Sequence, residues 1–399
     1  MRTSIAGFAG KKLLLPVFLL FLTKMVFAID NLILIPPQFS SSNSEYQAII
    51  KKLNEDLAGE FNKYEDQIRT DMAGLPSSFP NLAKAFANTS VFSSDGASQR
   101  GYEGYKAFSF TVGFMGALQF PRKFSILDEI KNAIGSGEGE GGFDFGRDNM
   151  DIGVGLDAQI LNAQLGINTS KFLLEGFYLG FKFSMFDTNW VKAMPLSDFS
   201  FKTMSLGITA SYQLINQMRL FGGLLVWRGL NLGTGFVWQN TSFGLTSSPH
   251  IADGLGNISV DAPAPIGTLN INFDEVFHLD INTNNFIIPI EAKTSIRLLW
   301  FMNFALGAGV DIAFGGSDIK AYGSLNVTEH SPLPADVELV EGTPRLEYSL
   351  GGKSAPSIFN VKAMGAVGFN FGPVIIDIPV TYYFLDNGYS LGVTFGFTF

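Results

Sequence analysis

The chain contains no cysteine, only 3 histidines among 399 residues, and 16% charged residues. Without cysteine it has neither a disulfide framework nor a zinc–cysteine site, and three histidines leave little material for a metal cluster. An average soluble domain is about 25% charged, so this chain is poor in charge. Its 27 basic residues are outnumbered by 36 acidic ones and form no basic cluster. We therefore expect no metal, no cofactor and no nucleic-acid partner.

The chain also lacks a long apolar run. The run Leu13–Leu22 is about ten residues, short of the roughly 20 that cross a bilayer as a helix. Lys11 and Lys12 precede it, and Val26-Phe27-Ala28 follows it with small residues at the cleavage positions. This layout is typical of a secretory signal peptide. Residues 1–28 are therefore predicted to be removed on export, with an uncleaved anchor helix as the alternative.

From residue 103 to residue 399 the sequence alternates with a period of two. In the last strand Leu391, Phe395 and Phe397 alternate with Gly392 and Thr394, and the same contrast recurs upstream. A soluble sandwich would carry many lysines and glutamates on its outer face. Here the phenylalanine-rich face suits lipid and the face of small residues suits a concave interior. The predicted fold class is an all-β membrane protein, an antiparallel transmembrane β-barrel, with a secreted sandwich as the alternative.

Short breaks and long segments alternate between these strands. Bacterial barrels have an even number of strands, short periplasmic turns and long outer loops, so both ends of the barrel chain are expected on the periplasmic side. The stretch Thr268–Asp280 alternates too, either as a hairpin above the membrane or as part of an extra strand pair. The prediction is about 10 strands, within a range of 10–14. The predicted strands span 105–119, 151–165, 171–187, 199–214, 218–242, 284–300, 303–318, 357–370, 373–385 and 389–399.

The segment at residues 29–102 is polar and predicted to be helical. Between Ser44 and Met72 apolar residues recur every three or four positions and form one narrow stripe. A second, short helix is predicted from Pro80 to Asn88. The segment is either a plug in the lumen or a periplasmic segment whose stripe binds a periplasmic partner. At 1.5 Å per residue the 44–72 helix is about 43 Å long, which favours the periplasmic mouth.

The sequence Ser390-Leu-Gly-Val-Thr-Phe-Gly-Phe397 resembles the carboxyl-terminal assembly signal of bacterial outer-membrane barrels, with Gly392, Phe395, Phe397 and Phe399 as its elements. This resemblance implies insertion by the barrel assembly machinery and contact with outer-membrane lipid. An amino-terminal segment ahead of a phenylalanine-rich barrel is also similar to the fatty-acid transporter (FadL-like) family, which implies a lumenal plug. That family has more strands, and Pro80-Asn81-Leu82-Ala83 approximates its Asn-Pro-Ala motif poorly, so no ligand residues are carried over.

Eight charged residues fall on inward positions of the predicted strands. A charge facing lipid costs about 2–4 kcal/mol at the bilayer midplane, so these side chains are expected to line the lumen. They either form a selective constriction or an ion-pair network that fills a closed barrel. The lumen-lining set is Asp157, Lys182, Glu291, Lys293, Arg297, Asp311, Lys362 and Asp377.

Aromatic residues near the predicted strand ends are expected to form interfacial girdles. They are Trp190, Trp227, Trp238, Trp300, Tyr382 and Tyr383.

The predicted function is that of a passive channel or transporter for small, including hydrophobic, solutes. Residues 29–102 would act as its plug or gate. The alternative is a non-conducting barrel with a structural, adhesin or partner-binding role, carried by the outer loops or the 44–72 helix. No histidine stands at a spacing that supports a nucleophile pair, so no enzymatic activity is expected.

Overall fold

The computed structural model divides the chain into two compact units, each described here by itself. Unit 1 comprises residues 1–77, 245–279 and 320–351, and unit 2 comprises 78–244, 280–319 and 352–399. The signal peptide predicted at residues 1–28 lies outside the described residues. None of the helices in the described ranges is both long and apolar enough to span a bilayer. The structure describes residues 31–72, 78–94, 107–120, 155–169, 175–190, 199–247, 257–262, 267–330, 333, 336–340, 343 and 345–399.

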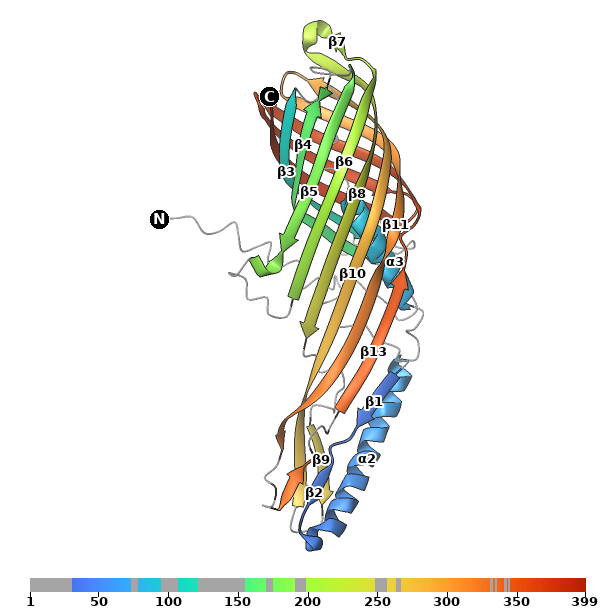
Figure 1. Ribbon diagram of the computed structural model, residues 1–399, viewed down its shortest axis with the longest axis vertical. Helices are drawn as coiled ribbons and strands as arrows, with labels where there is room; N and C mark the ends of the chain where they lie inside the picture. Colours follow the sequence, from blue (N-terminus) through green and yellow to red (C-terminus); the bar gives the residue numbers. More distant parts are fainter. Residues whose placement is uncertain are drawn as a thin grey trace, which may run out of the picture. The chain divides into compact units, whose positions relative to one another are not determined.

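Unit 2 contains a closed antiparallel barrel of ten strands (Figure 1), as the alternation predicts. Neighbouring strands pair in chain order, β16 pairs with β3, and the pairing of β10 with β11 completes the ring. The barrel strands are β3 (Phe108–Gln119), β4 (Gly155–Asn168), β5 (Phe177–Asp187), β6 (Phe199–Ile215), β8 (Leu225–Ser247), β10 (Gly267–Leu298), β11 (Met302–His330), β14 (Phe359–Phe371), β15 (Val374–Tyr383) and β16 (Gly388–Thr398).

Large apolar side chains cover the outside of the barrel. Along β16 the side chains of Phe395 and Phe397 are 57% and 46% exposed, while Thr394 and Thr398 on either side of this pair are buried. The same contrast holds on the other strands, where Phe110, Phe181 and Phe304 are exposed. A band of exposed phenylalanine requires an apolar surrounding. The rings face outward and are not enclosed between two sheets, which excludes the soluble sandwich.

One end of the barrel carries short turns. β14 and β15 are joined by two residues, and β10 and β11 by three. Phe108 and Phe399 exchange backbone hydrogen bonds of 3.1 and 2.8 Å at this end, so both ends of the barrel chain lie here, as predicted. One turn is longer than expected, because β7 (Met218–Leu220) and the 3-10 helix η5 (Phe221–Gly223) precede β8. Gly222 and Gly223 have φ of 66° and 94°, which ends the strand predicted to begin at residue 218.

The opposite end, called here the long-loop end, carries the connections that build unit 1. β9 (Asn257–Ala262) pairs with residues 267–272 of β10. The ambiguous stretch Thr268–Asp280 is therefore one arm of a hairpin, and that arm continues without a break into a barrel strand. Because β10 is one continuous strand from Gly267 to Leu298, no turn separates its two parts.

The amino-terminal segment is also part of unit 1. β1 (Asn31–Ile35) pairs with β13 (Arg345–Ser354), and β2 (Phe39–Ser41) pairs with β12 (Val337–Leu339). The helix α2 (Ser44–Met72) has the predicted bounds and buries its stripe of Ile50, Leu53, Leu57 and Phe61. The Asn54 side chain accepts a hydrogen bond from the Phe39 amide (2.9 Å) and donates one to the Phe39 carbonyl (3.0 Å), which holds α2 to β2.

The periplasmic placement of the 44–72 helix stays a prediction, and the contacts of this helix within unit 1 are as follows. β12 and β13 both belong to the connection between β11 and β14, at the long-loop end. The amino-terminal strands find hydrogen-bond partners there, and the apolar stripe of α2 is covered within the same unit. Residues 29–102 are not one body, because α3 (Ser78–Ser93) belongs to unit 2.

Candidate functional site: the occupied lumen

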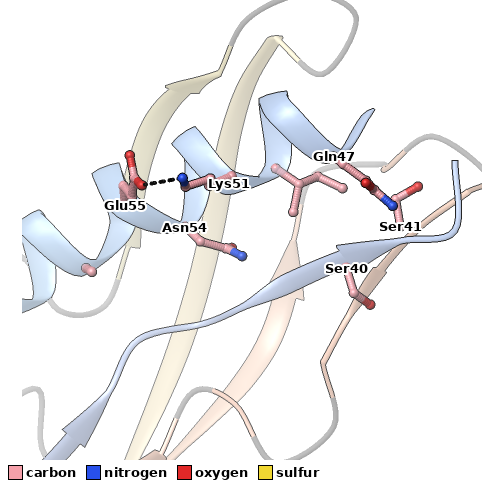
Figure 2. A pocket seen from close by; sticks show the side chains of 8 residues that line it. Ser40, Ser41, Gln47, Lys51, Asn54 and Glu55 are labelled. Carbon is pink, nitrogen blue, oxygen red and sulfur yellow. Dashed lines mark ion pairs between the residues drawn. The ribbon is translucent and has the colours of Figure 1, made fainter. Parts of the chain in front are cut away.

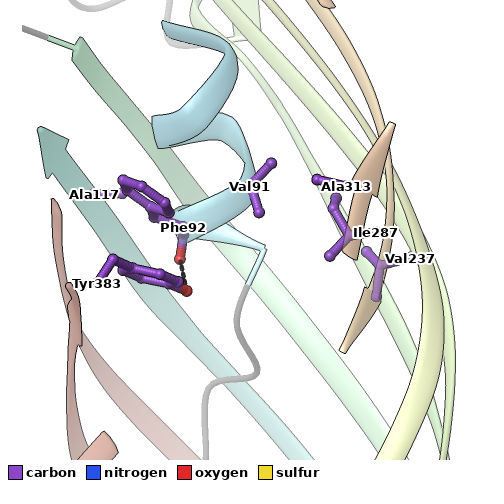
Figure 3. Packing of buried hydrophobic residues seen from close by; sticks show 7 residues of the cluster. All are labelled: Val91, Phe92, Ala117, Val237, Ile287, Ala313 and Tyr383. Atoms are coloured by element: carbon purple, nitrogen blue, oxygen red, sulfur yellow. Dashed lines mark hydrogen bonds between the residues drawn. The ribbon is translucent and has the colours of Figure 1, made fainter. Parts of the chain in front are cut away.

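The helix α3 lies inside the barrel. A surface helix keeps one polar face in water, whereas a helix buried all round is enclosed by other structure. From Ala87 to Ser94 every residue of α3 and its end is at most 4% exposed, although four of them are serine or threonine. The helix contacts β3, β4 and β16, while Val91 clusters with Val237 and Ile287 of β8 and β10 (Figure 3). α3 therefore bridges the lumen between opposite walls.

Small residues on both partners allow this close packing. A Cβ atom added at Gly155 would overlap the carbonyl oxygen of Ala85, and one added at Gly388 would overlap the ring of Phe92. Both glycines sit at the long-loop ends of their strands. Ala83, Ala85 and Ala87 supply the matching small surface of the helix. The wall is thus shaped to hold α3 near the long-loop end of the lumen.

Asp157 ties α3 to the wall through a buried polar cluster. Its carboxylate accepts hydrogen bonds from Ser93 Oγ of α3 (3.0 Å), from Gln239 Nε2 (2.8 Å) and from Thr241 Oγ1 (3.1 Å). The Gln239 amide also donates to Ser93 Oγ (2.6 Å). Since each of these groups is buried, breaking the cluster without water entry leaves unsatisfied polar atoms. The cluster therefore fixes the position of the helix.

Further hydrogen bonds hold the helix at several points along its length. Asn285 Nδ2 donates to the carbonyl of Ala87 (2.8 Å), and Asn88 Oδ1 accepts from the amide of Ser357 (2.7 Å). At the carboxyl end Lys182 Nζ donates to the carbonyl of Ser94 (3.3 Å). A cation stabilises the negative end of a helix dipole. Lys182 thus stabilises the carboxyl end of α3.

An aromatic stack also holds α3 against the barrel wall. The rings of Phe92 and Tyr383 lie 3.9 Å apart at 19°, and the Tyr383 hydroxyl donates to the Phe92 carbonyl (3.5 Å) (Figure 3). Tyr383 is 1% exposed. The prediction that Tyr383 belongs to an interfacial girdle is therefore wrong, because its position in β15 points it inward beside the equally buried Thr381.

Elsewhere in the lumen the predicted charged residues form an ion-pair network. Lys362 Nζ lies 2.7 Å from Glu291 Oε1 and 2.8 Å from Asp311 Oδ1, and Lys293 Nζ lies 2.5 Å from Glu291 Oε2. The two lysines and two carboxylates cancel in charge, and they come from β10, β11 and β14. A fully paired set stabilises buried charges that would otherwise be costly.

The structure gives each predicted lumen residue an inward or partly buried position. It places Asp157 and Lys182 at α3, and Glu291, Lys293, Asp311 and Lys362 in the ion-pair network. Arg297 is half-buried and Asp377 is buried, and both stand outside these two groups. The sequence analysis did not predict that Gln239, Thr241 and Tyr383 contact α3, although all three lie on inward positions. Within the described ranges no group of three or more His, Asp or Glu side chains can hold a metal ion.

A closed ten-stranded barrel with an apolar outer band and a polar lumen defines an outer-membrane β-barrel protein, here with a helix seated in its lumen. At its carboxyl end Phe395, Phe397 and Phe399 are exposed and Gly392 is buried. The sequence profile of the Lsa36-like family matches residues 38–399. The chain therefore belongs to the Lsa36-like family.

Solved barrels of several kinds are similar in fold. The translocator domain of the autotransporter NalP from Neisseria meningitidis is 9% identical, with 77% of this chain and 93% of that one covered at a TM-score of 0.27. The toluene transporter TbuX of Ralstonia pickettii is 8% identical (81% and 97% covered, TM-score 0.25). A FadL homologue of Pseudomonas aeruginosa is 11% identical (80% and 94% covered, TM-score 0.20). No curated protein matches the sequence.

Proposed function

We propose that this protein is a closed outer-membrane barrel that carries a binding module on the outer face of the membrane. The observation that carries the proposal is the seating of α3, which meets both walls of the lumen and is fixed by the Asp157 cluster. A helix held by this many buried contacts obstructs free diffusion of solutes. The role of the barrel is then to anchor unit 1, and unit 1 makes contact with a partner outside the cell.

The build of unit 1 supports a binding role. Its strands come from the long connections, which lie outside the cell in bacterial barrels, and β1 and β2 pair with two of those strands. Beside β2, α2 borders a pocket of about 500 Å³ (Figure 2). Six of its eight lining residues are polar, and four of these six are exposed. The lining is Ser40, Ser41, Gln47, Ile50, Lys51, Asn54, Glu55 and Ala58. Polar groups converging on a hollow give a surface that can select a partner by hydrogen bonding.

Two measurements test the proposal. The purified wild-type protein in planar bilayers is expected to give no steady conductance, and long-lived pores would contradict a closed barrel. Because the chain has no native cysteine, Lys52→Cys in α2 can be labelled with a membrane-impermeant maleimide on intact cells. Asn216→Cys, in a turn at the opposite barrel end, is the matched control and is expected to react only after lysis. Labelling of the control alone on intact cells would refute the outer placement of unit 1.

A gated channel for small, including hydrophobic, solutes is the second candidate. The observation that favours it is that the side chains of Glu291 and Lys293 keep 11% and 16% exposure, so water reaches the lumenal ion pairs. In this case α3 is a gate held by Asp157. Asp157→Ala would then give frequent, brief openings in the bilayer experiment, whereas a permanently closed barrel would stay silent with this substitution.

A further inference from the structure

On the outer surface of the barrel, the exposed aromatic residue Phe286 is followed by the amide Asn284 two positions along β10. Phe236 of β8 and Phe286 of β10 are 51% and 42% exposed and stack at 5.8 Å. The next outward residues toward the long-loop end are Trp238 and Asn284, and Trp238 Nε1 donates to Asn284 Oδ1 (2.8 Å). Tryptophan marks the boundary between hydrocarbon and headgroups. The wall beyond this pair therefore faces the polar headgroups of the outer leaflet.

A pocket of about 510 Å³ opens directly beyond this boundary, entirely within unit 2. Gly315, with φ of 133°, lines the pocket, and a Cβ atom at Gly316 would lie 3.0 Å from the carbonyl oxygen of Ser354. Backbone thus lies where side chains would otherwise fill the space. The pocket is lined by Asn240, Asn282, Thr283, Asn284, Gly315, Gly316, Ser317, Asp318, Lys353, Ser354 and Ala355.

The chemistry of the lining indicates the ligand. The three asparagine amides can each donate and accept hydrogen bonds, which matches a polyhydroxylated molecule. The Thr283 and Ser317 hydroxyls are buried and bond to each other (3.0 Å). The two charged residues of the lining, Lys353 and Asp318, form an ion pair at 2.9 Å and neutralise each other. A free phosphate ion therefore gains little electrostatic stabilisation in this pocket. Asn282 and Asn284 are exposed on the same face as the lipid-facing Phe286. A ligand that enters from this face comes from the membrane surface.

We propose that this pocket binds the saccharide headgroup of an outer-leaflet glycolipid, with the acyl chains lying over Phe236 and Phe286. The inference rests on the outer-membrane fold and is independent of whether the lumen conducts. It also differs from the proposed function, because it concerns the lipid-facing wall of the barrel and not unit 1.

The test uses the full-length protein in phosphatidylcholine vesicles, with purified lipopolysaccharide as the probe and tryptophan fluorescence or native mass spectrometry as the readout. Asn282→Leu and Gly316→Val are each expected to weaken lipopolysaccharide binding on the order of tenfold or more. Asn189→Leu replaces an exposed asparagine outside the pocket and is expected to bind as the wild type does. Heat-modifiable gel migration checks that each barrel is folded, so either pocket variant alone can decide the outcome.

Two competitors separate the sources of the ligand. The saccharide freed of its acyl chains is expected to compete, but more weakly than intact lipopolysaccharide, and inorganic phosphate is expected to have no effect. Unchanged binding by a folded pocket variant, or displacement by inorganic phosphate, would overturn the proposal. Equal affinity for the free saccharide would overturn the assignment to a lipid-linked ligand.

Discussion

The two amino-terminal helices follow each other in sequence but are stabilised in opposite ways. α2 buries one stripe and keeps lysines and glutamates on its other faces, as an amphipathic surface helix does. α3 has Lys84 as its one charged residue, is rich in alanine and serine, and is buried all round in its second half. The comparison teaches that a charged, amphipathic helix packs on a surface, whereas a nearly uncharged helix of small residues packs inside a barrel.

The largest expected effect comes from excluding α3 sterically. Gly155→Val places a branched side chain where the carbonyl of Ala85 lies, and this backbone cannot give way as a flexible side chain would. We expect α3 to leave the lumen and the bilayer conductance to rise at least tenfold over the wild type. Gly365→Val is the matched control, because its nearest neighbour is 3.9 Å away. Equal conductance of the two folded variants would show that α3 does not close the pore.

The reverse experiment disturbs α2 and leaves the barrel intact. Leu57 is fully buried in unit 1, and Leu57→Ala is expected to lower the free energy of unfolding of that unit by about 2–5 kcal/mol. Limited proteolysis of reconstituted protein should then cleave α2 faster, while heat-modifiable migration of the barrel stays unchanged. A simultaneous loss of the barrel band would show that the two units unfold together.

The barrel itself could be predicted from sequence because the alternation within each strand shows which of its side chains face lipid and which face the lumen. The alternation of Thr394 and Phe395, for example, predicts that Phe395 contacts lipid. Short breaks such as Gly372-Pro373 indicate which end of the barrel has the short turns. The count of about 10 strands, within a range of 10–14, follows from these two signals without knowledge of distant contacts. The inward positions of Lys362 and Glu291 follow in the same way.

Contacts between segments far apart in sequence could not be predicted to the same degree. The pairing of β1 with β13 joins residues that lie more than three hundred positions apart, and nothing in either strand specifies the other. Tyr383 lies at the end of a strand, which suggests a girdle, and only the buried Phe92 beside it explains its inward position. One signal for α3 was present: a helix with a single charge and many small residues is not stable in water unless it is enclosed.

A smaller effect is expected from removing one hydroxyl at the seat of α3. Tyr383→Phe keeps the ring stack with Phe92 but loses the 3.5 Å hydrogen bond to its carbonyl, which contributes about 0.5–1.5 kcal/mol. A cysteine at Ser90, buried in the wild type, reports the opening of the helix through its labelling rate. We expect Tyr383→Phe to raise that rate up to about tenfold. Tyr383→Ala, which also removes the stack, should raise it further, and equal rates for both would assign the whole effect to the hydroxyl.

The smallest effect is expected on the exposed face of α2. Lys51 and Glu55 form an ion pair at 4.0 Å with side chains that are 80% and 66% exposed, and exposed pairs of this spacing contribute at most about 0.5 kcal/mol. Lys51→Ala should therefore leave the proteolysis rate of unit 1 unchanged, in contrast to Leu57→Ala on the same helix. Since Lys51 also lines the pocket beside β2, a loss of partner binding by this variant at unchanged stability would assign the residue to recognition. A loss of stability would instead show that the charged face, and not only the stripe, holds α2 in place.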